Sequence, residues 1–346
     1  MLELMGGSVK HDHRHPVFNF LFEYYHFKSQ SLLDYSAGGE PVVLLLGEAG
    51  SEGDTQRDSG GAGGREKEEP TDCLPSILAS KAVSVQVEKA GAKYGMVQGV
   101  SWLPLPGRVS FTRKHVEALR LGREILRTTQ SRPPFFFCHG AHEWAMLYHP
   151  TSSAHPPPRK YQDSLPLRIS QTTLNGFVES RPIRCTHYDA FRFFAPEARP
   201  LNVWGQDLSE ARSHGQLAHE QPGCLHANMD LFKWAVKLGP YAPSDLLRQT
   251  LELAVACRVV DMRASPYDLS PLVLPVVKGR GMPSGYRFDA SPIKIETEEG
   301  RKEYQAEQQA LFDKAQPLRT RLLNVYDLFF RMWEIEEDLK LQSKEV

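Results

Sequence analysis

Beyond residue 111, apolar residues recur every three or four positions along most of the chain, which is the spacing of an amphipathic helix. The clearest case is the segment 112–129, where Val116, Leu119 and Leu126 share one face and Thr112 precedes the first turn as a candidate cap. The same spacing predicts further helices over residues 142–148, 209–219, 225–238, 244–263, 298–315 and 317–341. This part of the chain is therefore expected to be mostly helical.

Strand-like patterns are fewer and shorter. The run 42–46 is a candidate buried strand, and residues 83–87 alternate between apolar and polar side chains. Between residues 168 and 194, β-favouring stretches surround Asn175-Gly176, a dipeptide typical of a hairpin turn. The short run 135–137, which is Phe-Phe-Phe, is expected to be buried. The expected fold class is mainly α with a small β component, an α+β fold.

Composition divides the chain near residue 110. Residues 17–35 hold an apolar stripe that predicts one helix, whereas residues 47–70 contain no large apolar side chain. Such a segment cannot bury enough surface to offset the entropy lost on ordering, so we expect a disordered insertion there. We predict a variable N-terminal part, 1–110, and a single large, mainly helical body of catalytic type, 111–346.

The charge balance argues against a dedicated duplex-binding protein. The net charge is −1, with 41% of the 346 residues hydrophobic and 24% charged. Duplex-binding proteins usually carry a basic surplus, because phosphate contacts dominate their affinity. The net charge therefore does not support a nucleic-acid partner, although a local basic patch stays compatible with one.

Cysteine usage and hydropathy indicate the compartment. The five cysteines are scattered and include no CxxC pair, which indicates free thiols in a reducing environment. No apolar run reaches membrane-spanning length, and residues 1–16 lack the apolar centre of a signal peptide. We expect a soluble intracellular protein, cytoplasmic by default, with no membrane partner; the pattern favours no particular oligomeric state.

Polar residues gather in four segments, which begin at Cys138, Arg184, Cys224 and Asp261 and are set among apolar residues. Buried His, Asp, Glu and Arg side chains need partners or a ligand, so we expect these segments to meet in one polar pocket. The candidate catalytic residues are His142, Glu143, His187, Asp189, His226 and Asp230.

A metal site is one interpretation of this pocket. His139, His142 and Glu143 share one helical face, as ligands of helical metal sites do. The zinc pattern HExxH is absent, because Met146 stands four residues after His142. The alternative is a histidine bonded to a backbone carbonyl beside a surface glutamate. The candidate ligands for a divalent metal (zinc, iron or manganese) are His142, Glu143, His187 and His226.

Acid–base chemistry is a second interpretation. His226 and Asp230 are four residues apart, so on a helix their side chains stack, as in pairs that orient a general base. The same pairing is a common way to satisfy a core histidine. Cys224 precedes an expected helix, whose N-terminus would lower the pKa of its thiol. The alternative interpretation of Cys224 is a small, buried residue that acts as an apolar side chain.

A third set of polar residues is expected to bind the substrate. Its members are Arg184, Arg192, Asn228, Arg263, Tyr267 and Asp268. Asp261 and Asp268 flank Arg263, whose planar fork suits a carboxylate or phosphate. The alternative is an internal salt bridge that ties a helix end to the turn after it.

The longest motifs are HEWAM at 142–146, EQPGCLHANMDL at 220–231 and DMRASPYDL at 261–269, with shorter matches at 15–25, 183–194, 198–202 and 295–301. Together they resemble a family of uncharacterised proteins from actinobacteria, plants and algae, many of which carry the automatic name 3-methyladenine DNA glycosylase. The resemblance implies base excision by hydrolysis of an N-glycosidic bond. Family members start further upstream, so it also implies a missing N-terminal segment and an organellar location as the alternative to the cytoplasm.

The residues do not support the glycosylase name by mechanism. Helix-hairpin-helix glycosylases combine an LPGxG hairpin with a catalytic Asp about 20 residues later, in a basic groove. Here Leu105-Pro106-Gly107 matches only the first half, and no Asp occurs between Gly107 and Asp163.

Three functional hypotheses follow. The first is an enzyme, most simply a hydrolase, that acts on a small ring-containing or anionic substrate through the His/Asp/Glu/Arg pocket, with a divalent metal as candidate cofactor. The second is a DNA base glycosylase, which predicts a basic groove beside the pocket and a water-activating carboxylate from Asp189 or Asp230. The third is a non-catalytic binding module, which predicts neither an open pocket nor a bound metal.

Overall fold

The computed structural model describes residues 42–46, 83–89, 98–104, 112–154, 156–158, 165–210, 212–272 and 289–342. From residue 112 onward the described residues are mainly helical, as the apolar spacing predicts. No described helix is long and apolar enough to cross a membrane. The helix expected over 17–35 and the disordered insertion expected over 47–70 lie outside the described residues.

Three strands precede the helical body. They are β1 (Val42–Leu46), β2 (Val83–Lys89) and β3 (Gln98–Pro104). They pair antiparallel in the order β1-β3-β2, so Trp102 of the central strand lies opposite Val42 on one side and Val85 on the other. Both runs that the sequence marks as strand-like fall within this sheet.

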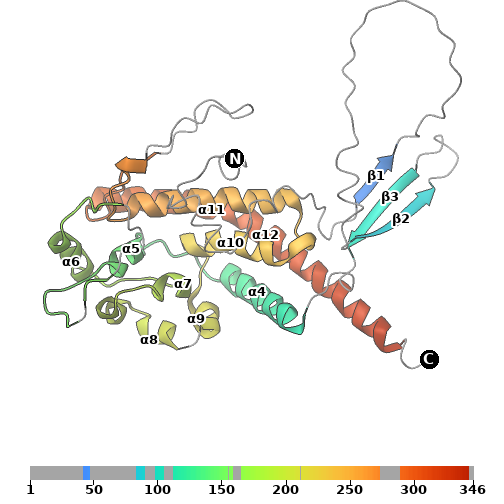
Figure 1. Ribbon diagram of the computed structural model, residues 1–346, viewed down its shortest axis with the longest axis horizontal. Helices are drawn as coiled ribbons and strands as arrows, with labels where there is room; N and C mark the ends of the chain where they lie inside the picture. Colours follow the sequence, from blue (N-terminus) through green and yellow to red (C-terminus); the bar gives the residue numbers. More distant parts are fainter. Residues whose placement is uncertain are drawn as a thin grey trace, which may run out of the picture.

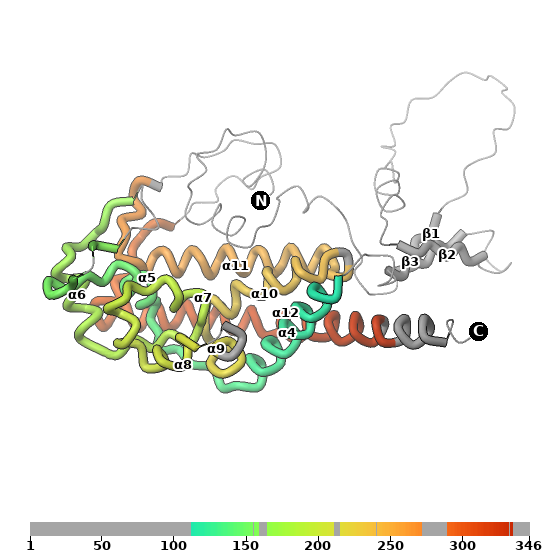
Figure 2. The backbone as a smooth tube through the Cα atoms, turned by 60° about the horizontal axis from the view of Figure 1, so that its bottom comes forward, coloured from blue at the N-terminus to red at the C-terminus, as the bar shows by residue number. Residues whose placement is uncertain are grey.

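Three long helices form the centre of the helical body. They are α10 (Leu225–Lys237), α11 (Ser244–Ala264) and α12 (Glu298–Gln342), which lie side by side in both views (Figures 1 and 2). The expected bounds of α10 and α11 are confirmed. Their shared core includes the fully buried side chains of Phe232, Ala254 and Tyr326. Burial of these apolar faces stabilises the arrangement of the three helices.

Helix α4 (Arg113–Ser131) covers α10 and α12 and confirms the expected segment 112–129. Its cap is Thr112, whose side chain accepts a hydrogen bond from the backbone N–H of His115. Gly122 lets α4 approach α10 closely, because a Cβ there would lie 2.7 Å from the ring of Trp234. At the surface, Arg123 binds Asp327 of α12 at 2.6 Å.

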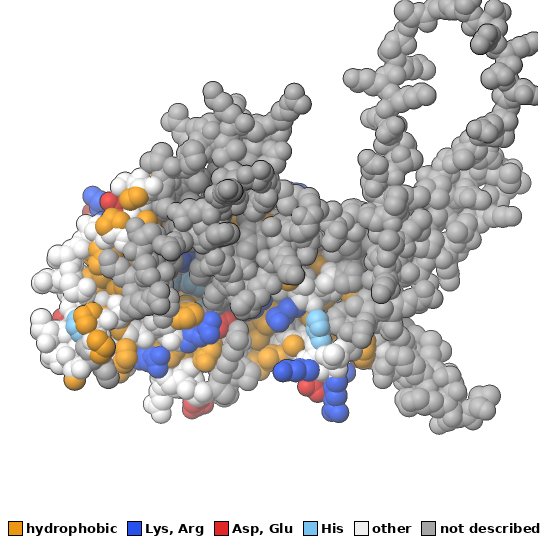
Figure 3. Space-filling model, viewed as in Figure 1, with side chains coloured by type: hydrophobic (Ala, Val, Ile, Leu, Met, Phe, Trp, Pro, Cys, Tyr) orange, Lys and Arg blue, Asp and Glu red, His pale blue; other side chains and the backbone are white. Residues whose placement is uncertain are grey.

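Shorter helices gather at one end of the long ones (Figure 1). They are α5 (Ala141–Met146), α6 (Gln171–Glu179), α7 (Tyr188–Phe191), α8 (Gly205–Ser209) and α9 (Arg212–His219), with 3-10 turns at Pro196–Leu201, Gly239–Tyr241 and Ser270–Leu272. The helix expected over 209–219 corresponds to α9, which begins three residues later than expected, at Arg212, whereas Ser209 ends α8. On the face drawn in Figure 3, the coloured apolar, basic and acidic side chains are interspersed.

The hairpin expected at Asn175-Gly176 is wrong, because both residues lie inside α6. Ser170 caps this helix by accepting from the backbone N–H of Thr173, and the buried residues of α6 include Leu174 and Phe177 at helical spacing. In segment 165–210 the extended pairings are isolated bridges.

Two further expectations are corrected. The helices expected over 298–315 and 317–341 are one continuous helix, α12, with Pro317 inside it. Pro317 lacks the N–H of an interior residue, but the buried side chains of Ala315 and Leu322 on either side hold the helix against its neighbours. The run 135–137 is not buried, since Phe137 is 54% exposed.

Candidate functional site

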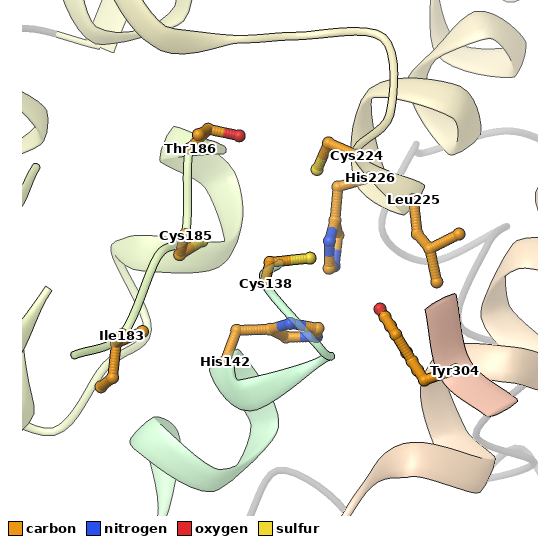
Figure 4. A pocket seen from close by; sticks show the side chains of 9 residues that line it. All are labelled: Cys138, His142, Ile183, Cys185, Thr186, Cys224, Leu225, His226 and Tyr304. Atoms are coloured by element: carbon orange, nitrogen blue, oxygen red, sulfur yellow. The ribbon is translucent and has the colours of Figure 1, made fainter. Parts of the chain in front are cut away.

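The polar residues of the four motifs meet where the short helices join the long ones. His142 comes from the first turn of α5, Thr186 from the chain before α7, His226 from the first turn of α10 and Tyr304 from α12 (Figure 4). The chain enters α5 through two left-handed residues, His139 with φ 48° and Gly140 with φ 69°. This turn directs the first turn of α5 toward α10, so residues far apart in sequence share one site.

A first group of three candidate metal ligands consists of His142, His226 and Asp261. One nitrogen or oxygen atom from each lies within 4.8 Å of the others. His142 Nε2 is 2.8 Å from Asp261 Oδ1, within ion-pair distance, but no hydrogen bond of regular geometry satisfies either atom. Ligand atoms around one divalent ion lie about 3 Å apart, given bond lengths near 2.1 Å. With its Nε2 unprotonated, His142 would face Asp261 Oδ1 as a second ligand of one cation.

The two histidines of this group face each other closely. Their ring centroids are 4.4 Å apart and their planes are almost perpendicular, at 86°. Burial first, and then the charge of His142, lowers the pKa of His226 well below its ordinary value. The imidazole of His226 is therefore neutral at neutral pH, which is the form that binds a metal.

Behind Asp261 lies a buried arginine. Arg258 Nη1 donates to Glu143 Oε1 at 2.8 Å and also to Asp261 Oδ2, so it holds the carboxylate oxygen that faces away from His142. Burial opposes ionisation of Asp261, but His142 and Arg258 hold its pKa well below the usual range. Glu143 is thus bound to a cation, and it orients Asp261 through Arg258.

A second group of candidate ligands adjoins the first. It consists of His187, Glu220 and Asp230, all buried, with His187 Nε2 3.3 Å from Asp230 Oδ2 and 3.7 Å from Glu220 Oε2. The His187 ring stacks on the His226 ring at 5.2 Å and 28°, so the two groups are neighbours. Each group has a buried cation, but in a different position: Lys233 Nζ binds Asp230 Oδ2, the oxygen that faces His187, whereas Arg258 binds the oxygen of Asp261 that faces away from His142.

The second group carries strongly shifted pKa values. Burial raises the pKa of Glu220. Burial opposes the charged form of His187, but hydrogen bonding and the charges of Asp230 and Glu220 raise its pKa. Burial also opposes ionisation of Asp230, but Lys233 and His187 hold its pKa below the usual range. Asp230 is therefore the favoured anion of the group, whereas burial favours the protonated form of Glu220.

The first group borders a small cavity. Its volume is about 330 Å³ with the part open to solvent included, but the interior has room for roughly one water molecule. The lining residues are Cys138, His142, Ile183, Cys185, Thr186, Cys224, Leu225, His226 and Tyr304 (Figure 4). Burial raises the pKa of the Cys224 thiol well above its ordinary value, so the lowering expected from its position before α10 is wrong.

The structure brings together the six candidate catalytic residues, but in different roles. His142 and His226 line the cavity. Glu143 is behind it, bound to Arg258. His187 and Asp230 belong to the second group, and Asp189 lies beyond them, with its Oδ2 3.7 Å from Lys233 Nζ.

The candidate substrate-binding residues lie outside the cavity lining. Arg184 is exposed, and Arg192 is 3.4 Å from Asp189 with its guanidinium over Phe193. Asn228 is fully buried and accepts from Arg319 at 2.5 Å. Tyr267 is buried in a bridge to Leu167, and Asp268 accepts from the backbone N–H of Ser270.

Arg263 has different partners from those that the sequence indicates. It pairs with Asp289, Glu303 and Glu307 and so ties the end of α11 to α12. Asp261 instead takes Arg258, because side chains three apart on a helix are neighbours and those two apart are not.

Five residues of this region are not among the site residues that the sequence predicts: Glu220, Lys233, Arg258, Asp261 and Tyr304. The sequence indicates Asp261 only as a partner of Arg263. Lys233 and Arg258 had a usable signal, since each stands three positions from an Asp on an otherwise apolar helix face. Glu220 and Tyr304 had none, because only the packing of the helices brings them here.

Comparison with protein-family models, curated proteins and solved structures gave no match, so the interpretation of the site rests on its own geometry.

Proposed function

We propose that this protein is a divalent-metal-dependent enzyme that acts on a small ring-containing or anionic substrate. The supporting observation is the first ligand group: His142 Nε2 and Asp261 Oδ1 face each other at 2.8 Å without a hydrogen bond, with His226 beside them and a cavity in front. Two imidazoles and one carboxylate are a common donor set of catalytic zinc and non-haem iron sites.

The proposed donor set would leave coordination positions of the metal open to a substrate or a water molecule. Three protein ligands do not complete the coordination of a divalent ion, and the remaining positions would face the cavity. A metal there would supply Lewis-acid polarisation of a substrate oxygen or of a water molecule. Its residual positive charge, with one carboxylate among its ligands, favours an anionic substrate group.

The cavity walls contribute the rest of the proposed recognition. Ile183 and Leu225 offer apolar surface, and Thr186 and Tyr304 offer hydroxyl groups. Since the interior holds roughly one water molecule, binding of a ring requires these walls to move apart. Burial raises the pKa of Tyr304 well above its ordinary value, so its hydroxyl stays protonated and can donate to a substrate oxygen. These residues would orient the substrate, and the metal ligands would face its reacting group.

Elemental analysis of the purified protein tests the proposal. We expect stoichiometric zinc, iron or manganese in the wild type and at least a ~10-fold loss in His142→Ala, His226→Ala and Asp261→Asn. His139→Asn is the matched control, because His139 is in the same segment but outside the ligand group, and Asn tolerates its positive φ. Far-UV circular dichroism reports whether each variant folds. A wild type without metal after expression with metal supplied contradicts the proposal.

The glycosylase alternative rests on the family resemblance and needs a basic groove beside the site. One described groove, lined by Arg123, Asn324, Asp327 and Arg331, lies about 35 Å further along α12 than Tyr304, at ~1.5 Å per residue, and its Arg123 is paired with Asp327. Release of free base from alkylated DNA, lost in Asp230→Asn, would favour that alternative. Retention on a DNA column without base release would indicate binding alone.

A further inference from the structure

The two ligand groups are similar in composition but differ in which carboxylate oxygen their buried cation holds. In the first, which consists of His142, His226 and Asp261, Arg258 binds Asp261 Oδ2 and leaves Oδ1 facing His142. The second has a histidine and two carboxylates at comparable spacing, with an ammonium group already in contact. The stacked rings of His187 and His226 make the two groups parts of one centre.

The position of Lys233 explains this difference. It lies three residues after Asp230 on α10, is 8% exposed, and has its ammonium 4.5 Å from the ring centroid of Trp234. Its Nζ binds Asp230 Oδ2, the same oxygen that lies 3.3 Å from His187 Nε2, and lies 3.7 Å from Asp189 Oδ2. The ammonium therefore occupies the side of Asp230 that a metal held with His187 would need.

We propose that Lys233 is the built-in cation of the second group, and that it makes the centre mononuclear. Removal of the Lys233 charge should turn His187, Glu220 and Asp230 into a second divalent-metal site. The number of metals at the whole centre rests on the proposed function, which places the first metal at His142, His226 and Asp261.

The physical reason is charge balance in a dry interior. Buried carboxylates need a compensating cation, and a hydrogen-bonded ammonium provides one without a metal. A divalent ion held with His187 would have to share Asp230 Oδ2 with that ammonium, which places like charges in direct proximity at low effective dielectric constant, whereas Arg258 holds the oxygen of Asp261 that faces away from the first site. Without the ammonium, the same carboxylates and His187 form a ligand set that attracts a divalent ion.

The test is metal stoichiometry in full-length protein dialysed against zinc or manganese, with thermal unfolding followed in parallel. We expect one metal per chain in the wild type and two in Lys233→Met, which keeps the apolar stem and removes the charge. We also expect a lower Tm for metal-free Lys233→Met, raised by metal more than the Tm of the wild type is. Lys233→Arg keeps the charge and should bind one metal, as should Lys237→Met, which changes an exposed lysine on the same helix.

The outcomes separate the two proposals. Two metals in the wild type, or one in a folded Lys233→Met, overturns the inference about Lys233. Loss of the gained metal in the double variant Lys233→Met/His187→Gln supports it. A wild type without metal contradicts the proposed function. In that case the inference about Lys233 stands only if Lys233→Met gains a metal and the double variant Lys233→Met/His187→Gln loses it again. Any other result overturns the inference.

Discussion

Arg258 lies one helical turn before Asp261 on α11 and donates a hydrogen bond to its Oδ2 atom. The other oxygen, Oδ1, is thereby turned toward His142 Nε2, 2.8 Å away. Glu143, which binds the same guanidinium nitrogen from α5, completes the support. The orientation of the candidate ligand Asp261 is thus fixed by a residue that does not line the cavity.

We predict that Arg258→Lys weakens metal binding about 10- to 100-fold, because an ammonium cannot reproduce the guanidinium that orients Asp261. Arg258→Met should lower the free energy of unfolding by about 3–5 kcal/mol, since it leaves two buried carboxylates without their cation. Competition with a chelator and urea unfolding measure the two effects. The control Arg248→Met removes an exposed ion pair on the same helix and should cost less than ~0.5 kcal/mol. Unchanged metal affinity in Arg258→Lys would contradict the supporting role.

Gly176→Ala tests the helical assignment of α6. Gly176 is exposed in the helix interior, with nothing within 4 Å of the position of a Cβ, so Ala should raise the free energy of unfolding by about 0.5–1 kcal/mol. A hairpin turn with positive φ at this glycine would give the opposite sign. Urea unfolding of the variant and wild type decides between the two.

Gly122→Ala tests the close packing of α4 on α10. Because a Cβ at Gly122 would lie 2.7 Å from the ring of Trp234, the ring or the helix must move, at a cost of about 1–3 kcal/mol. The measurement is again the free energy of unfolding in urea. If Gly122→Ala leaves the free energy of unfolding unchanged or raises it, as expected for an exposed helical glycine, then α4 and α10 lie further apart than described.

Pro317→Ala tests the continuity of α12. In a continuous helix the exposed Pro317 removes one backbone hydrogen bond and crowds the preceding turn, so alanine should stabilise the protein by up to ~3 kcal/mol. Two separate helices, with the proline at the start of the second, would show little change. Differential scanning calorimetry gives the shift in Tm.

The pair Arg168–Glu296 should contribute stability that depends on pH. The guanidinium binds both carboxylate oxygens, and although burial opposes ionisation, Arg168 lowers the pKa of Glu296. The contribution is therefore complete above the unfolded pKa of about 4.3 and is lost as pH falls through the lower folded value. We expect Glu296→Gln to cost about 1–2 kcal/mol at pH 7, and less as the pH falls below about 4. A difference that is independent of pH would contradict this.

The helices of the body could be predicted from the sequence, because burial of one helix face requires apolar residues at regular, local spacing. Leu119 and Leu126 of α4 are buried, as their spacing predicts. Two wrong predictions also came from local signals, which the packing of the whole chain outweighs. Asn175-Gly176 has turn chemistry, but the cap at Ser170 and the buried Leu174 and Phe177 outweigh that preference. Pro317 has the chemistry of a helix start, but packing on both sides carries the helix through it.

The sequence by itself determined which residues were the candidates for chemistry, since polar side chains in apolar helices need partners. It also predicted that His142, His187 and His226 lie together; the structure brings their rings together, although only His142 and His226 line the cavity. Tertiary structure alone decided the partners: Arg258 with Glu143, 115 positions away, and Lys233 with Asp189. The reason is that such contacts depend on how α5, α7, α10 and α11 cross, and spacing along one helix does not encode where another helix crosses it.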